Sequence, residues 1–500
     1  MRGFRQRQAA ALLTVVLGAA LAACTPGNAQ TQAEGDGGLG GTQRGADAKP
    51  AQVALATGAA RQSAGVVAAG GPGAPYNYGP SVMLDGTTTR MWWCSQYPTA
   101  APPGDDILYG ESASLDGPFT GPGGAVPPAV LSGNPGQFDG VHTCDPSVVR
   151  VDGTYYLYYT GAAGDHALGN AIGLATSTDG LTWTRSPGPV VGPSHDVHRD
   201  NTYGAGQPSA VYLDGWFYLM FTDTTGQAAG WNGAGQFVLR AKDPAFSNGV
   251  ESLTAKGFTP VSGTSTPRAV SLVDAFSADL EWVDGLDAFA IAHETENGTT
   301  LTFWNRDFTA HPYREVVIPG AWREGPGLVR RPDGHAPASA TDPCGRIPFD
   351  VVRATSLGEA NAPTDLKHFG LDVTGVNACA TRDRAIGVLD GFAMPSPVRT
   401  MDLVADGKLV RVDRRSVAVQ LANHVLDQRL DALDGVPVSA HLTAGAPAVQ
   451  ATGLGLGLVL DGGNLWLVHP ATVATLNGSP VKTVSAAEWR AYPEAGTLGR

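Results

Sequence analysis

The stretch His142-Thr-Cys-Asp145-Pro-Ser-Val-Val-Arg-Val-Asp152-Gly-Thr-Tyr-Tyr-Leu-Tyr-Tyr-Thr160-Gly decides the fold of this chain. Its first half contains β-branched valines and its second half is rich in tyrosine, and both compositions favour strands. Between the two halves, Asp152-Gly153 is a dipeptide that favours a tight hairpin turn. The stretch therefore predicts two antiparallel strands joined by a turn.

Weaker copies of this pattern recur along the chain. Each copy starts near a short turn motif, usually with a proline, and reaches an Asp-Gly pair a few residues later. The starts are Gly79, Asp145, Gln207, Asp279 and Glu324. Further strand-like segments follow, as in 108–119 and 173–183. Units of about 45 to 70 residues with four strands each are typical of propeller blades. We expect an all-β chain with a five-bladed β-propeller over 74–397; a β-sandwich of similar hairpins is the alternative.

The last hundred residues have a different character. Short hairpins are predicted around Asp406-Gly407 and Asp461-Gly462, and a brief helix is predicted after Ser485, with Ser485 as its N-cap and Glu488 three residues later. We expect residues 398–500 to form a small β-rich accessory module.

Composition limits the classes of partner. The chain has 500 residues, 43% of them hydrophobic, which indicates a globular protein. Its 33 basic and 46 acidic residues give a net charge of −13. Nucleic-acid binding requires a basic surface and is therefore not expected. An acidic surface suits a neutral partner such as a glycan, although mild acidity also simply aids solubility.

The N-terminal segment has the pattern of an export signal. Basic residues at positions 2, 5 and 7 precede an apolar run over 9–20, which is too short for a comfortable transmembrane helix. The run ends in Leu21-Ala22-Ala23-Cys24, which resembles the lipobox of bacterial lipoproteins. This resemblance implies a signal peptide over 1–23 and a lipid on Cys24, so that the chain contacts the membrane only through its lipid. Residues 24–73 are poor in large apolar side chains and are predicted to be a flexible tether.

Four further cysteines remain: Cys94, Cys144, Cys344 and Cys379. An even number in an exported chain indicates disulfides. Three pairings are possible, and we favour the sequence neighbours, Cys94–Cys144 and Cys344–Cys379. The spacing differs from that of zinc sites.

In a propeller the innermost strands of all blades start at one mouth on the central axis. The five starts should therefore converge, and three of them carry a carboxylate: Asp145, Asp279 and Glu324. Carboxylates that face each other across a mouth suit inverting glycoside hydrolysis, in which one activates water and the other protonates the leaving oxygen. A third acid can raise the pKa of the general acid.

The three motifs Asp145-Pro-Ser-Val-Val, Asp279 before its strand, and Glu324-Gly-Pro-Gly-Leu-Val-Arg-Arg resemble, in type and order, those of glycoside hydrolase family 43. That family, which includes arabinanases and β-xylosidases, has a five-bladed propeller. The resemblance covers roughly 140–340. It implies that Asp145 is the base, Asp279 a modulator and Glu324 the acid, with Glu281 and Asp274 as alternatives for the modulator. It further implies that no cofactor is needed, although a calcium ion in the central channel is possible. The unit over 74–135 precedes the motifs and must close the ring.

Several other side chains are candidates for sugar binding. His142, Gln207 and Trp322 are the favoured ones, with Trp322 as a stacking platform. Three more tryptophans, Trp92, Trp93 and Trp231, could also stack on sugar rings, but blade core is the favoured interpretation for them. The polar cluster over 195–200 could bind a metal or line the cleft, and a solvated loop is the simpler interpretation.

Two functions compete at this point. The first is a monomeric glycosidase of arabinose- or xylose-containing glycans, lipid-anchored in the cell envelope on the outer face of the cytoplasmic membrane. The second is a propeller that binds glycans or supports the envelope without catalysis, because fold alone does not fix function.

Overall fold

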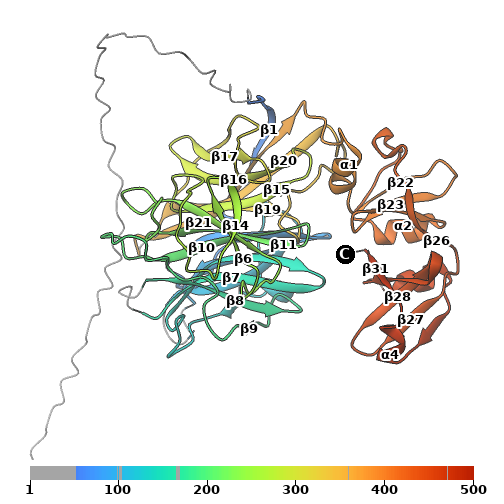
Figure 1. Cartoon of the computed structure of the whole chain (residues 1–500), viewed down its shortest axis with the longest axis horizontal. Helices are drawn as coiled ribbons and strands as arrows, with labels where there is room; N and C mark the ends of the chain where they lie inside the picture. The colour runs from blue at the N-terminus through green and yellow to red at the C-terminus, as the bar shows by residue number, and fades with distance from the viewer. Residues whose placement is uncertain are drawn as a thin grey trace, which may run out of the picture. The chain divides into compact units, whose positions relative to one another are not determined.

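A computed structural model describes residues 52–97, 100, 104–164, 169–358, 360–469 and 471–499. The signal peptide, Cys24 and the first half of the expected tether lie outside these residues. The described chain is an all-β protein whose larger part is a five-bladed propeller (Figure 1). None of its helices is long and apolar enough to span a membrane.

The first four blades follow one another along the chain as antiparallel sheets. Blade 1 is β2–β5, blade 2 is β6–β9, blade 3 is β10–β14 and blade 4 is β15–β18. Their strands are β2 Asn77–Asp85, β3 Thr88–Ser95, β4 Asp106–Ser112, β5 Ala129–Leu131, β6 His142–Val151, β7 Thr154–Ala162, β8 Ala171–Ser177, β9 Thr184–Arg185, β10 Ala205–Leu213, β11 Trp216–Asp223, β12 Gln236–Ala241, β13 Glu251–Thr254, β14 Gly257–Pro260, β15 Ala278–Val283, β16 Ala288–Thr295, β17 Gly298–Trp304 and β18 Val316–Pro319.

The fifth blade is built from both ends of the propeller sequence. It consists of β19 (Glu324–Arg330), β20 (Arg346–Leu357), β21 (Pro363–Thr374) and, as its outer strand, β1 (Ala56–Gln62), which pairs antiparallel with β21. Figure 1 shows β1, at the blue end of the colour bar, close to the orange strands of this blade. The prediction of a tether up to residue 73 is therefore wrong for its last part, because Ala56–Gln62 is a strand and Val67 is buried in the core. Ala56–Gln62 has no alternating apolar pattern, so the sequence did not indicate this strand. Its backbone pairs with that of β21.

The ring closes where β19 runs parallel to β2, with Val329 opposite Val82. As expected, the blade that starts at residue 77 completes the circle next to the one that starts at Glu324. Apolar side chains fill the spaces between successive blades, and the largest of them, including Trp92 and Trp93, are fully buried. These two tryptophans are blade core, as predicted.

Both disulfides form as predicted. Cys94–Cys144 joins β3 of blade 1 to β6 of blade 2, directly before Asp145. Cys344–Cys379 joins the loop before β20 to the segment before α1 (Arg382–Val388).

The C-terminal part contains two five-stranded sheets with short helices, and it begins earlier than residue 398. Phe392–Pro395 is already strand β22 of its first sheet. The predicted helix is present as α4, with the reciprocal Ser485–Glu488 capping box. The other elements are β23 Met401–Ala405, β24 Lys408–Val412, α2 Arg415–Leu421, β25 His424–Val425, β26 Val438–Leu442, β27 Ala448–Ala451, β28 Gly455–Leu460, β29 Asn464–Val468, α3 Thr472–Asn477, β30 Val481–Thr483, α4 Ala486–Trp489 and β31 Glu494–Leu498.

Candidate active site

The inner strands of blades 1, 2, 3 and 5 share one local backbone device. Each has a residue in the left-handed region followed by proline, and each has a register shift at this point. The left-handed residues are Gly79, Asp145, Gln207 and Gly325, with φ between 48° and 54°. The bulge re-aims the start of the strand toward the mouth. Glycine at position 79 avoids a tight contact, because a Cβ there would lie 3.2 Å from Asp145 Oδ1.

The position of this bulge shows which residues of the five inner strands are equivalent in the structure. In blade 5 the equivalent of Asp145 is Gly325, so Glu324 precedes the equivalent position by one residue. Blade 4 has no bulge: β15 keeps a regular register from Ala278 onward. The sequence pattern predicted that the five residues are equivalent, whereas the backbone makes only Gly79, Asp145 and Gln207 equivalent.

A pocket at the mouth brings most of the predicted residues together. It is lined by residues from all five inner strands and from the segment before β15: Gly79, Pro80, Asp145, Pro146, Gln207, Pro208, Ser277, Ala278, Asp279, Glu324, Gly325 and Pro326. The empty space in and directly above this open pocket is about 360 Å³, a volume that includes some bulk solvent. The three predicted carboxylates and Gln207 all line it, whereas His142 and Trp322 do not.

Asp145 and Glu324 are half-buried carboxylates at this mouth. Burial, and then repulsion from Glu324, raise the pKa of Asp145 to about 7. Burial also raises the pKa of Glu324, although two hydrogen bonds oppose the rise: Ser277 Oγ donates to Glu324 Oε1 over 3.1 Å and Gln207 Nε2 over 3.2 Å. Hydrogen bonds to the side chains of Thr160 and Tyr203 oppose the rise in the pKa of Asp145, and the Tyr203 hydroxyl donates to Asp145 Oδ2 over 3.4 Å.

Asp279 occupies a different level. Its Oδ2 accepts the N–H of Leu328 in the next blade over 2.7 Å. Serine side chains make the equivalent bond in the earlier blades: Ser81 accepts from Val148, Ser147 from Ala210, and Ser209 from Leu280, over 2.8–3.0 Å. Asp279 is therefore the fourth member of a ring of acceptors that ties the inner strands of blades 1 to 5 in succession, and the backbone pairing of β19 with β2 closes the circle.

Arg330, from β19, lies inside this ring. Its Nη1 donates to the carbonyls of Leu280 (2.8 Å) and Ala210 (3.1 Å) and lies 3.3 Å from Asp279 Oδ1. Its Nη2 lies 3.4 Å from both Ser81 Oγ and Ser147 Oγ. Only 2% of the side chain is exposed. The guanidinium thus contacts the inner strands of blades 1 to 4 and neutralises Asp279.

A channel calcium does not fit this ring. Arg330 already supplies the cation there, and its charge and volume exclude a second one. In the part of the chain that the structure describes, the only cluster of potential metal ligands is Cys94, Asp105 and Cys144. Its two cysteines form a disulfide and offer no thiolate.

The remaining predicted residues have structural partners. His142 Nδ1 lies 3.0 Å from Asp105 Oδ2, and this hydrogen bond raises the pKa of His142. Trp322 donates its indole N–H to the Thr295 carbonyl over 2.6 Å. In the loop over 195–200, Arg199 and Asp196 bond backbone groups of neighbouring loops. Trp231 was expected in the blade core, which is wrong: it is 93% exposed.

Three side chains of this centre were not predicted: Tyr203, Ser277 and Arg330. Ser277 stands two residues before Asp279, and Arg330 belongs to the quoted Glu324 motif, so both had a sequence signal from proximity. For Tyr203 the sequence offered none.

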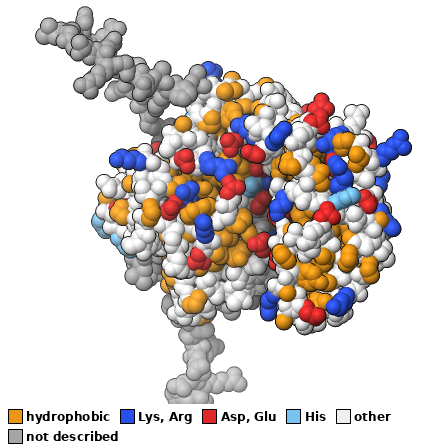
Figure 2. Space-filling model, turned by 45° about the vertical axis from the view of Figure 1, so that its right-hand side comes forward, with side chains coloured by type: hydrophobic (Ala, Val, Ile, Leu, Met, Phe, Trp, Pro, Cys, Tyr) orange, Lys and Arg blue, Asp and Glu red, His pale blue; other side chains and the backbone are white. Residues whose placement is uncertain are grey.

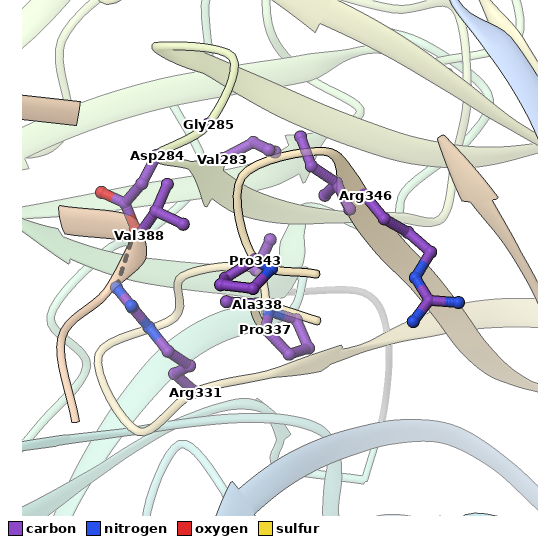
Figure 3. A pocket seen from close by; sticks show the side chains of 11 residues that line it. Val283, Asp284, Gly285, Arg331, Pro337, Ala338, Pro343, Arg346 and Val388 are labelled. Carbon is purple, nitrogen blue, oxygen red and sulfur yellow. Dashed lines mark hydrogen bonds and ion pairs between the residues drawn. The ribbon is translucent and has the colours of Figure 1, made fainter. Parts of the chain in front are cut away.

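A second, smaller pocket lies away from the mouth, beside α1, and is shown in Figure 3. Its charged groups compensate each other: Arg331 Nη2 lies 2.8 Å from Asp284 Oδ2, and Arg331 Nη1 donates to the Gly387 carbonyl over 3.0 Å. The pocket therefore marks a joint between α1 and blades 4 and 5. On the face in Figure 2, acidic and basic side chains are interspersed, without a broad basic field of the kind that nucleic acid requires.

Comparison with known proteins gives distant structural likenesses only. No family model matches the chain. No curated protein sequence matches it either. A family 117 glycoside hydrolase, Zg3597 of Zobellia galactanivorans, is similar over 64% of this chain and 91% of its own, with 10% identity and a TM-score of 0.42. The catalytic domain of a Coprinopsis cinerea GH62 α-L-arabinofuranosidase is similar over 63% and 96%, with 13% identity and a TM-score of 0.39. Likenesses this distant say nothing about the substrate of this chain.

Proposed function

We propose that this chain is a glycoside hydrolase that acts at the propeller mouth with Asp145 and Glu324. One observation carries the proposal: these two carboxylates, from opposite ends of the propeller sequence, line one open pocket with raised pKa values and no cation among their hydrogen-bond partners. Perturbed acids in a cleft are typical of acid–base catalysis. A purely structural pair would be expected to have a neutralising partner, as Asp279 has in Arg330.

The reaction we propose is inverting hydrolysis. A carboxylate takes a proton from water while the water oxygen bonds to the anomeric carbon. The bond from that carbon to the leaving oxygen breaks, and the second, protonated carboxyl gives its proton to this oxygen. The two groups must therefore carry one proton between them, and mutual repulsion favours this state.

The surroundings of the two carboxylates favour one division of roles. Glu324 accepts bonds from Ser277 and Gln207 that stabilise its ionised form. Asp145 also has two hydroxyl partners, Thr160 and Tyr203, yet burial and repulsion from Glu324 still raise its pKa to about 7, which suits the protonated partner. In our proposal Glu324 is the base and Asp145 the acid, the reverse of what the family resemblance implies. Asp279 is a positioning residue, since Arg330 and backbone groups use both of its oxygens.

For the substrate we propose a neutral arabinose- or xylose-containing glycan. The choice of sugar rests on the resemblance to family 43. Neutrality is supported by the pocket itself, because two half-buried acids would repel uronic acids. Gln207 faces the same pocket and is the proposed contact for a sugar hydroxyl.

The test compares Asp145→Asn and Glu324→Gln on aryl arabinosides and xylosides with good and poor leaving groups. A nitrophenolate leaves without protonation, so Asp145→Asn should keep most activity on it and lose roughly 10²–10⁴-fold on an alkyl glycoside or a polysaccharide. Glu324→Gln should lose activity on all of them. Wild-type activity in either variant on the polysaccharide refutes the carboxylate pair, and the opposite pattern reverses the two roles.

A glycan-binding protein without catalysis is the second candidate. The observation in its favour is the Gln207–Glu324 hydrogen bond, which links blades 3 and 5 across the mouth and occupies Glu324 Oε1. Retention on a glycan without product release in the assay above would support it.

We also propose that the chain is exported and anchored by lipid at Cys24. The support is the sequence pattern over 1–24 and the two disulfides, which require an oxidising compartment. Metabolic labelling with a palmitate analogue should modify the wild type and leave Cys24→Ser unlabelled.

A further inference from the structure

Trp231 stands out among the tryptophans of this protein. All ten lie in described parts of the chain, and Trp231 is the one that is exposed, with 93% of its surface open to solvent. A large aromatic side chain gains free energy when it is buried, so an exposed indole can contribute to binding if a ligand covers it.

The loop that carries Trp231 begins at the mouth. It connects β11 to β12 over 224–235, and the register of blade 3 pairs Asp223 with Ala205 and Thr222 with Gly206. The loop therefore starts beside the residues that directly precede Gln207, a lining residue of the mouth pocket.

The tip of the loop is held in one shape. Gly230 donates its N–H to the Ala234 carbonyl over 2.7 Å, and Gly233 donates to the Gly230 carbonyl over 2.9 Å, so that Trp231 lies inside a closed turn. Arg199 braces the base of the loop from outside, with bonds of 2.8–3.1 Å to three of its carbonyls. A rigid support lowers the entropy lost when an exposed ring binds a ligand.

The same turn is tied to the proposed acid. Asn201 Nδ2 donates to the carbonyl of Asn232, the neighbour of Trp231, over 3.0 Å. Asn201 Oδ1 accepts the N–H of Tyr203 over 3.0 Å, and the Tyr203 hydroxyl donates to Asp145 Oδ2. One hydrogen-bonded chain thus links the support of Trp231 to the carboxylate at the mouth.

We propose that Trp231 is a stacking platform for a sugar ring of the glycan whose bond lies at Asp145 and Glu324, so that the substrate is an oligosaccharide or polysaccharide and not a single-sugar glycoside. This inference rests on the proposed function for the position of the cleaved bond. Sugar rings present apolar C–H faces that match an indole, and the site is two-part: a platform on the loop and an acidic pocket at the mouth. An exposed neutral aromatic group again suits a neutral glycan.

The test uses the full chain with Glu324→Gln, which blocks turnover, in native gels that contain soluble arabinan or xylan. We expect the parent variant to be retarded by at least one of the two polymers, with Trp231→Ala weakening the affinity roughly ten-fold and Trp231→Tyr restoring most of it. Val398→Ala, which shortens an exposed apolar side chain of the C-terminal part, is the control and should bind like the parent. Equal retardation of Trp231→Ala and the parent, or none of the parent on both polymers, overturns the platform.

Two further arms separate this proposal from others. Product release by wild type is measured in parallel: if no glycan is cleaved while retardation still depends on Trp231, hydrolysis fails and the platform stands. Co-sedimentation with phosphatidylglycerol–phosphatidylcholine vesicles tests a membrane as the occupant. Binding to vesicles that Trp231→Ala abolishes, without retardation by either polymer, would assign the indole to the lipid surface and refute the sugar platform.

Discussion

The mouth and the acceptor ring below it use the same inner strands and treat a carboxylate in opposite ways. At the ring, Asp279 takes a backbone N–H, and Arg330 offsets its charge. At the mouth, Asp145 and Glu324 face each other with neutral donors only. A compensated carboxylate holds the blades together, whereas an uncompensated one keeps a raised pKa and is available for proton transfer. Neutralisation, more than position in a motif, separates the structural acid from the proposed reactive ones.

The largest effect should follow from Arg330→Met, which leaves Asp279 buried and unpaired. Loss of one partner of a buried pair costs about 3–5 kcal/mol of unfolding free energy, to be measured by urea denaturation. Adding Asp279→Asn should recover part of this loss, because the unpaired charge is then removed. Arg90→Met, which breaks the more exposed pair with Asp85, is the control and should cost about 1 kcal/mol or less. Equal losses in Arg330→Met and the control would contradict the role of the ring.

A smaller effect is expected from Ser147→Ala within the ring. The substitution leaves the buried N–H of Ala210 without its acceptor and removes one contact of Arg330. A buried donor without a partner costs about 1–3 kcal/mol. The exposed Ser114→Ala should change the free energy of unfolding by about 0.5 kcal/mol or less. A loss that small in Ser147→Ala would show that the serine is dispensable.

At the mouth we expect a gain in stability instead of a loss: Asp145→Asn should increase the free energy of unfolding. The folded-state pKa of Asp145 is about 7, above its unfolded value, so the native state binds the proton more tightly. Stability from this group is therefore present at low pH and is lost as the pH rises from about 4 to 7. We expect the variant to be about 1–2 kcal/mol more stable than wild type at pH 8, a value that allows for the partial exposure of Asp145. Thermal melts at pH 8 and pH 4 measure the difference, which should vanish at pH 4; a variant less stable at pH 8 would refute the repulsion.

Much of this arrangement could be predicted from sequence. The recurring Asp-Gly turns and aromatic strands predicted five blades, and cysteine order predicted both disulfides, because these signals are local. Strand β1 could not be predicted in the same way: Ala56–Gln62 has no apolar pattern, and only the open edge of β21 makes it a strand. The level of Asp279 also escaped prediction, since it depends on a bulge that four blades have and blade 4 lacks. The exposure of Trp231 depends on a turn closed by backbone hydrogen bonds, and side-chain hydrophobicity alone gave the wrong answer.

The smallest predicted effect addresses the roles within the pair. Gln207→Leu removes the amide that donates to Glu324 Oε1, and with it the Gln207 Oε1, which has no hydrogen-bond partner among the described residues. The pKa of Glu324 should then rise further, because the lost hydrogen bond had stabilised the ionised form. In a pH profile of kcat/KM, the base sets the acidic limb and the acid sets the basic limb. If Glu324 is the base, the acidic limb moves to higher pH and the basic limb stays; if Glu324 is the acid, only the basic limb moves. Ser277→Ala removes the second donor to the same oxygen and should move the same limb in the same direction, so a shift of different limbs in the two variants would show that these bonds do not set the pKa of Glu324.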